Sequence, residues 1–196
     1  MGKLTFNETI KNAAQPLLLP IVKILASWGI HPNTVTITCL LGFVISSFFI
    51  AFGNLLLGGI ALLLFSPLDA IDGLLARYSK KVTSFGAFLD STLDRYGEIF
   101  LFLAFTYYFL NQKSLYGVIL SFLAITGSLM VSYTRARAEG IGFECKIGFL
   151  TRFERIFLLI IALIFDICIP LLIFIAIFTH LTALQRIVYV YKLYRR

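Results

Sequence analysis

The chain has 196 residues, of which 59% are hydrophobic, 15% aromatic and 14% charged, and its formal net charge is +7. Soluble domains are about 45–50% apolar and about 25% charged, so this composition excludes an ordinary water-soluble enzyme. It also excludes a disordered chain, which would contain far fewer apolar residues, and three cysteines are too few for a disulfide framework. We therefore expect an all-α integral membrane protein.

The first segment, from about residue 4 to 28, is apolar but is interrupted by Pro16 and Pro20 and by two lysines. Such a segment is too broken to cross a bilayer and is typical of a helix that lies along the membrane surface. We predict an N-terminal interfacial amphipathic helix, with an extra span as the alternative. Asn33 or Thr34 is then expected to cap the first membrane-spanning helix.

Hydropathy predicts six transmembrane helices, since about 20 apolar residues are needed to cross a bilayer. Pro170 falls between the last two, where a short connection suits proline better than a helix interior does. We expect residues 1–196 to form a single membrane domain. The six predicted spans are residues 34–53, 55–77, 85–110, 114–135, 152–170 and 171–190.

The distribution of charge predicts the orientation in the membrane. The connections after the first, third and fifth spans carry few charges, among them Lys113 and the nearby Asp166. Positive residues gather in the cytoplasmic loops of membrane proteins, so the opposite side, with both termini, is expected to be cytoplasmic. That side holds Lys3, Lys11, Lys23, Arg77, Lys80, Lys81, Arg135, Arg137, Lys146, Arg152, Arg155, Arg186, Lys192, Arg195 and Arg196.

Four of the ten acidic residues lie close together in predicted membrane segments. Asp69 and Asp72 are three positions apart, and Asp90 and Asp94 are four apart, so each pair shares one face of a helix. Residues 78–85 form a tight turn between the two helices. The helices are therefore expected to be antiparallel neighbours, with their acidic faces meeting in the cytoplasmic half of the bilayer.

Carboxylates in a low-dielectric environment need compensating positive charge, and intramembrane acids usually mark function. Oxygen ligands suit Mg²⁺ or Mn²⁺, and two such ions can clamp phosphate oxygens. The small residues Gly73, Ala76 and Gly86 allow close approach, while Arg77 and Thr83 suit a phosphate group. A divalent-cation transporter is the distant alternative, but transporters commonly show midplane sites and internal repeats.

The stretch DAIDGLLARYSKKVTSFGAFLDSTLD, from Asp69 to Asp94, resembles the signature of the CDP-alcohol phosphotransferase family, D-x2-D-G-x2-A-R-x8-G-x3-D-x3-D. Every fixed position of this long, gapped pattern is present. The resemblance implies that a CDP-activated lipid, CDP-diacylglycerol or CDP-archaeol, donates its lipid-phosphate group to an acceptor hydroxyl and releases CMP. It further implies that Asp94 is the general base and that the protein is a homodimer.

The resemblance also assigns residues to ligands. It implies that two Mg²⁺ or Mn²⁺ ions are bound by Asp69, Asp72, Asp90 and Asp94. It implies that the CDP-lipid contacts Asp69, Gly73, Ala76, Arg77, Thr83, Gly86 and Asp90. The expected partners are thus the lipid bilayer, a CDP-lipid and an acceptor, with no nucleic acid.

The stretch SYTRARAEGIGFECKIGFLTRFER, residues 132–155, resembles the corresponding region of phosphatidylinositol-phosphate synthases and their archaeal archaetidylinositol-phosphate relatives. This second resemblance implies inositol 1-phosphate as the acceptor, with glycerol 3-phosphate as the alternative. The surplus positive charge on this side would form a binding pocket for the phosphate of such an acceptor. The alternative for Arg152 and Arg155 is that they are cytoplasmic anchors of the kind the positive-inside rule describes. The candidate ligands of the acceptor phosphate are Arg135, Arg137, Lys146, Arg152 and Arg155. Glu98, one helical turn beyond Asp94, is expected to orient Arg95 or the acceptor, or to form a simple ion pair.

Overall fold

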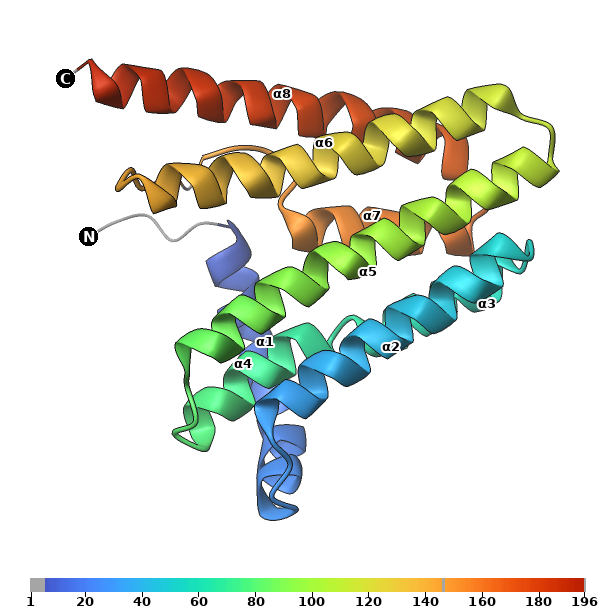
Figure 1. Ribbon diagram of the computed structural model, residues 1–196. Helices are drawn as coiled ribbons and strands as arrows, with labels where there is room; N and C mark the ends of the chain where they lie inside the picture. Colours follow the sequence, from blue (N-terminus) through green and yellow to red (C-terminus); the bar gives the residue numbers. More distant parts are fainter. Residues whose placement is uncertain (1–5, 146, 196) are drawn as a thin grey trace.

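The computed structural model describes residues 6–145 and 147–195, with side chains described from residue 15 onward. These residues form eight α-helices and no strands, as expected for an all-α chain. Most of the helices run side by side, while α1 crosses them at one end (Figure 1). The helices are α1 (Phe6–Ser27), α2 (Pro32–Ala51), α3 (Leu55–Phe65), α4 (Leu68–Tyr78), α5 (Ser84–Asn111), α6 (Leu115–Gly140), α7 (Arg152–Ile164) and α8 (Cys168–Tyr194).

Four helical segments are long and apolar enough to cross a membrane, which makes the chain a multi-pass membrane protein. They are Pro32–Ala51, Leu55–Tyr78, Leu115–Gly140 and Cys168–Tyr194, and they match four of the six predicted spans. Of the two remaining predicted spans, α5 has 28 residues but carries four charged residues among its first 15. The other remaining span corresponds to α7, which has only 13 residues, about 20 Å of helix at 1.5 Å per residue.

Two local predictions about these helices are wrong. His31, rather than Asn33 or Thr34, caps α2, and its Nδ1 accepts a hydrogen bond from the Asn33 N–H at 3.3 Å. Pro32 then occupies the first helical position, where its fixed φ and missing N–H carry no penalty. Pro170 lies in the first turn of α8 rather than in a connection. Proline is tolerated in the first turn because the N–H groups there have no acceptor within the helix, so its missing N–H costs no hydrogen bond.

The predicted span 55–77 is divided into two helices at Ser66–Pro67. Pro67 cannot donate a backbone hydrogen bond to α3, so the chain bends and α4 begins at the next residue. Asp69 consequently lies in the first turn of α4, where the helix dipole favours an acidic side chain. This bend therefore sets the position of Asp69, the first aspartate of the spaced motif.

The N-terminal helix α1 packs against α4. Their contact is a small apolar cluster of Val22, Ile71 and Leu75, which Val35 of α2 completes. Pro16 and Pro20 both lie inside α1. Its course across the other helices (Figure 1) is compatible with the predicted interfacial placement, although residues 4 and 5 of the predicted segment lie outside the described part.

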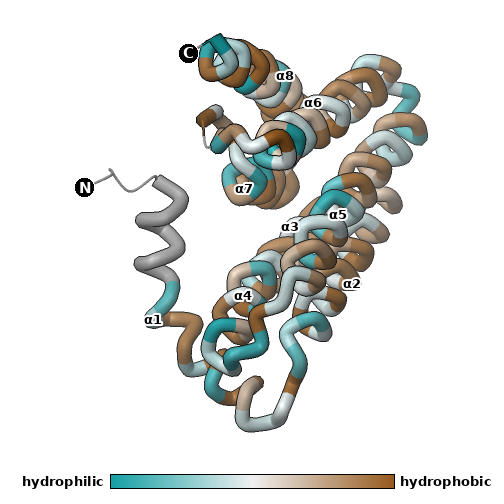
Figure 2. Tube along the Cα trace, turned by 60° about the vertical axis from the view of Figure 1, so that its left-hand side comes forward, coloured by the Kyte–Doolittle hydropathy of each residue, from teal (hydrophilic) through white to brown (hydrophobic). Residues whose placement is uncertain are grey.

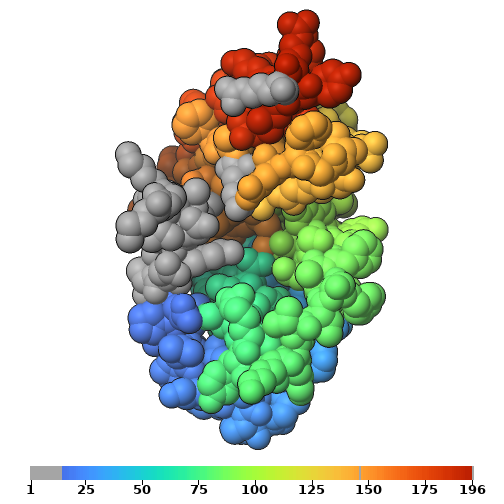
Figure 3. Space-filling view, turned by 90° about the vertical axis from the view of Figure 1, so that its left-hand side faces the viewer, coloured from blue at the N-terminus to red at the C-terminus, as the bar shows by residue number. Residues whose placement is uncertain are grey.

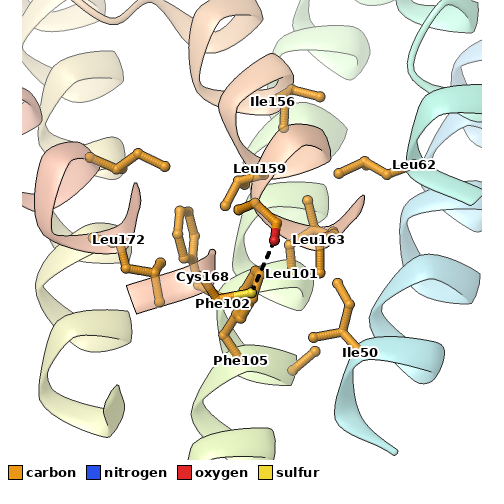
Figure 4. Packing of buried hydrophobic residues seen from close by; sticks show 14 of the residues in the cluster. Ile50, Leu62, Leu101, Phe102, Phe105, Ile156, Leu159, Leu163, Cys168 and Leu172 are labelled. Atoms are coloured by element: carbon orange, nitrogen blue, oxygen red, sulfur yellow. Dashed lines mark hydrogen bonds between the residues drawn. The ribbon is translucent and has the colours of Figure 1, made fainter. Parts of the chain in front are cut away.

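The main core joins both halves of the molecule. Figure 4 shows α7 inserted among α3, α5 and α8, with Leu159 and Leu163 against Leu62 and Leu101. The Cys168 thiol, at the start of α8, donates to the Ala162 carbonyl at 3.5 Å. Figure 2 shows hydrophilic residues around the α4–α5 turn and mainly hydrophobic residues along the far part of α6. The core thus fixes α7 against the helix that carries Asp90 and Asp94.

Candidate active site

The predicted acidic faces of α4 and α5 meet. Carboxylate oxygens of Asp69, Asp90 and Asp94 all lie within 4.8 Å of one another. The short turn formed by residues 79–83 connects α4 to α5, and both helices pack against α2, so the two Asp-bearing faces can approach each other. Oxygen ligands at this spacing suit a hard divalent cation such as Mg²⁺ or Mn²⁺. The donor set therefore fits the metal that the sequence implies.

Asp72, the fourth predicted metal ligand, is outside this closest group but lines the same pocket. Its side chain is buried, and its Oδ2 accepts a hydrogen bond from the Thr36 hydroxyl at 2.7 Å. A hydroxyl donated to a carboxylate stabilises the ionised form and fixes its orientation. Thr36 comes from α2, so the site draws on a third helix that the acidic motif does not contain.

Arg152 supplies positive charge to the acidic cluster. Its Nη1 forms an ion pair with Asp94 Oδ1 at 2.8 Å and also hydrogen-bonds Asp69 Oδ1. The guanidinium carbon lies 5.6 Å from the centre of the Phe43 ring, a cation–π arrangement. Arg152, the first residue of α7, therefore connects α4 and α5 through a single nitrogen atom.

Arg155, one turn further along α7, is bound differently. Its Nη2 lies 2.6 and 2.9 Å from the two carboxylate oxygens of Glu98, and its Nη1 donates to the Leu150 carbonyl at 2.9 Å. The side chains of Arg155 and Glu98 are 1% and 2% exposed. This fully buried ion pair confirms that Glu98 pairs with an arginine, but its partner is Arg155 rather than Arg95.

The loop before α7 is attached to α8. The Thr182 hydroxyl donates to the Phe149 carbonyl at 2.6 Å and accepts from the Phe149 N–H at 3.1 Å. Arg186 is buried and donates from Nε to the Ile147 carbonyl at 2.8 Å. Gly148 between them has a φ of +124°, which favours glycine. These contacts fix the start of α7, and with it Arg152.

The residues predicted to contact the CDP-lipid lie around the α4–α5 turn. Thr83 caps α5, and its Oγ1 accepts from the Gly86 N–H at 3.0 Å. A Cβ on Gly86 would lie 3.3 Å from Asn33 Oδ1, so α2 also borders this region. Arg77 is exposed at the end of α4 and reaches back over Gly73. Ala76 lies beside them on α4, half-buried.

The five predicted acceptor ligands are distributed unevenly. Among the four that the structure describes, Arg152 is the one that contacts the acidic cluster, and Arg155 is bound to Glu98. Arg135 forms an exposed i,i+4 ion pair with Glu139 at 2.8 Å near the end of α6, and Arg137 is exposed in the last turn. Lys146 lies outside the described residues. Figure 3 looks onto this end of the molecule, where the α4–α5 turn and the end of α6 both reach the surface.

Known proteins share this arrangement. Residues 29–190 match the family described as CDP-alcohol phosphatidyltransferase. The archaetidylinositol phosphate synthase of Pyrococcus horikoshii is 39% identical over 171 residues, covering 85% of this chain and 87% of that protein. A match of this extent shows that the chain belongs to the CDP-alcohol phosphatidyltransferase family.

Solved structures agree with this assignment. The phosphatidylinositol phosphate synthase of Mycobacterium tuberculosis with CDP-DAG bound superimposes with a TM-score of 0.84 at 26% sequence identity, covering 90% of this chain and 94% of that one. A second structure of the same enzyme, in complex with manganese and citrate, gives a TM-score of 0.81 at 27% identity, covering 89% and 88%. The likeness extends over nearly the whole chain.

Proposed function

We propose that this protein transfers a phosphatidyl or archaetidyl group from a CDP-activated lipid to the hydroxyl of inositol 1-phosphate and releases CMP. The observation that carries the proposal is the complete spaced aspartate motif, in which carboxylate oxygens of Asp69, Asp90 and Asp94 converge across α4 and α5 within 4.8 Å. Relatives named for synthesis of inositol phosphate lipids support the acceptor. Glycerol 3-phosphate remains the alternative acceptor.

The carboxylates are proposed to hold two divalent cations, Mg²⁺ or Mn²⁺, through Asp69, Asp72, Asp90 and Asp94. The oxygen-rich donor set and the manganese complex of the M. tuberculosis enzyme support divalent-cation binding. When bound, such ions neutralise phosphate charge and orient the reacting groups. Thr36 keeps the Asp72 carboxylate in place for this role.

The donor is proposed to lie beside the α4–α5 turn, where Gly73, Ala76 and Gly86 leave room for the cytidine and diphosphate. Arg77 and Thr83 offer a cation and a hydroxyl to the phosphates, and Asp69 and Asp90 border the same space. The open position of Arg77 and the small residues beneath it support this placement.

Asp94 is proposed to act as the general base. It takes the proton of the acceptor hydroxyl while the hydroxyl oxygen bonds to the β-phosphorus. The bond from the β-phosphorus to the bridging oxygen breaks, and CMP leaves with that electron pair. Arg152 lies 2.8 Å from Asp94, so an acceptor phosphate bound by Arg152 would bring the polyol hydroxyl close to the base. Arg135, Arg137 and Lys146 would widen this basic region.

The membrane arrangement is proposed to be a single domain of six spans. In this arrangement α5 and α7 cross together with the four apolar segments, and α1 lies along the cytoplasmic surface. The active site and both termini are on the cytoplasmic side, and two chains form a homodimer. Figure 1 shows the α4–α5 turn and the C-terminal ends of α6 and α8 at the same end of the molecule, which supports a common side for the positive residues.

The test is acceptor-dependent release of CMP from CDP-diacylglycerol or CDP-archaeol by the purified protein with Mg²⁺. Asp94→Asn is expected to lower kcat by about 100-fold or more, as general-base loss does. Asp166→Asn, an exposed aspartate at the other end of α7, is the matched control and should retain activity. Full activity in Asp94→Asn would refute the mechanism.

An acceptor panel of inositol 1-phosphate, glycerol 3-phosphate, inositol and serine decides the substrate, and turnover with glycerol 3-phosphate alone would refute the inositol assignment.

A further inference from the structure

Arg152 contacts two of the three carboxylates that could bind a divalent cation. A single nitrogen, Nη1, contacts one oxygen of Asp69 and one oxygen of Asp94. The same two residues, with Asp90, form the group of oxygen ligands suited to a divalent cation. A guanidinium and a divalent cation at these carboxylates compete for the same negative charge, so each weakens the binding of the other there.

We propose that Arg152 is an exchangeable internal counter-ion. It neutralises the acidic cluster until a divalent cation displaces it, and the released guanidinium then binds the acceptor phosphate. This inference deepens the proposed function and rests on it. Arginine suits both tasks, because it is always charged and its planar fork fits carboxylate and phosphate alike.

The surroundings of Arg152 allow its side chain to move while its backbone stays fixed. Thr151 and Glu154 form a capping box at the start of α7, in which the Thr151 N–H donates to Glu154 Oε2 at 2.5 Å. The buried Arg155–Glu98 pair anchors the next turn. Displacement of Arg152 thus requires only side-chain rotation.

Arg152 is itself incompletely bound in its present position. Within the described part of the chain its buried Nε makes no hydrogen bond, and the nearest acidic oxygen, on Glu98, is 3.8 Å away. An unsatisfied buried donor has a free-energy cost, which reduces the net advantage of this position. The Nε of Arg155 is also unsatisfied among the described residues, so burial distinguishes the two arginines. Arg155 is 1% exposed in its pair with Glu98, whereas Arg152 is 16% exposed and lines the pocket, which makes Arg152 the more readily displaced arginine.

Displacement would also prepare the base. While Arg152 pairs with Asp94, the carboxylate is less available to accept a proton from the acceptor hydroxyl. Release of the guanidinium removes this contact and places a positive group near the acceptor phosphate at the same time. By reciprocity, an acceptor phosphate that binds Arg152 should raise the affinity for the cation.

The first experiment measures Mn²⁺ binding to the detergent-solubilised full chain by calorimetry. Arg152→Gln is expected to bind Mn²⁺ on the order of tenfold more tightly than the parent, because the competitor is gone. Arg95→Gln is the matched control: it removes the same charge from beside Asp94, where Arg95 Nη1 lies 3.5 Å from Oδ2 on a more exposed side chain. Its affinity should change by less than about threefold. Equal affinities for the parent and Arg152→Gln, or equal gains in both variants, would overturn the inference.

The second experiment uses the unmodified protein and does not depend on a variant that folds. Phenylglyoxal labelling of Arg152, quantified by mass spectrometry of peptides, is expected to rise at least severalfold when Mn²⁺ is added. Arg155 should remain protected with and without Mn²⁺, because it is 1% exposed in its pair with Glu98. Unchanged labelling of Arg152 upon Mn²⁺ binding would overturn the inference. CMP release is measured separately, so a failure of the counter-ion model with normal turnover leaves the proposed function intact.

Discussion

Replacement of Glu98 by alanine is expected to destabilise the protein strongly. The variant leaves the guanidinium of Arg155 buried, 1% exposed, without the two oxygens that now lie 2.6 and 2.9 Å from its Nη2. The Leu150 carbonyl, a neutral acceptor at 2.9 Å from Nη1, does not replace that charge. Removing one partner of a buried ion pair costs about 3–5 kcal/mol, and we expect Glu98→Ala to lose stability in this range.

The double variant Glu98→Leu/Arg155→Met supplies the control. It removes both charges at similar volume, and such replacements of buried pairs are neutral or stabilising by up to about 4 kcal/mol. Unfolding of the single and double variants, measured by circular dichroism in mixed micelles, gives the comparison. A loss below about 1 kcal/mol in Glu98→Ala, or equal losses in the single and double variants, would refute the argument from buried charge.

Kinetics of the double variant distinguish two roles for Arg155. If Arg155 positions α7, the folded double variant should keep a KM for the acceptor within about tenfold of the parent, because Arg152 remains. If Arg155 binds the acceptor phosphate directly, loss of a charge-assisted bidentate contact should raise that KM by about 100-fold or more. The second result would restore Arg155 to the acceptor site.

Three further outcomes are expected. Thr36→Val removes a hydroxyl bonded to the Asp72 carboxylate at 2.7 Å, which should cost about 1.5–3 kcal/mol and raise the Mg²⁺ concentration needed for half-maximal CMP release; Thr36→Ser should behave as the parent. Gly148→Ala should destabilise by about 1–3 kcal/mol in the same unfolding assay, since φ is +124° and the new Cβ would strike the Thr182 methyl; Gly142→Ala, with φ +87° and open space, should cost less. Chelation by EDTA should abolish CMP release, and added Mg²⁺ should restore it; activity that persists in EDTA would exclude a divalent cation.

Local spacing was sufficient to predict the central part of the site. The three- and four-residue intervals place the aspartates on helix faces, and a turn of a few residues forces α4 and α5 together. Both predictions hold for Asp69, Asp90 and Asp94, whose oxygens converge within 4.8 Å. The short connecting turn limits how far the two helices can separate, and packing of both helices against α2 completes the arrangement.

The parts of the site that come from distant helices could not be predicted in this way. Arg152 bonds to Asp69 across 83 positions, and Thr36 bonds to Asp72 across 36. These contacts depend on how α2 and α7 pack, which the periodicity of each helix alone does not specify. The same reason explains why the sequence offered five equivalent basic candidates for the acceptor, whereas the structure brings Arg152 to the carboxylates.

Hydropathy predicted where the helices lie along the chain, but not where they break or how long each one is. It averages over a window, so it does not resolve the bend at Pro67 or the short length of α7, which ends at Ile164. Both irregularities serve the site. The bend places Asp69 in the first turn of α4, and the start of α7 brings a charged side chain to the carboxylates instead of a further apolar turn.

Arg152 and Arg155 show how one short motif can provide two functions. The two arginines are three positions apart, so both project from the same side of the first turn of α7 toward α5. Burial separates their roles. Arg155 is 1% exposed and bound to both oxygens of Glu98, so moving it would leave two buried charges uncompensated. Arg152 is 16% exposed and lies at the pocket, where a divalent cation or an acceptor phosphate can replace its present contacts. The fixed arginine thus holds the helix in place, while in the proposed mechanism Arg152 exchanges its contacts and takes part in binding.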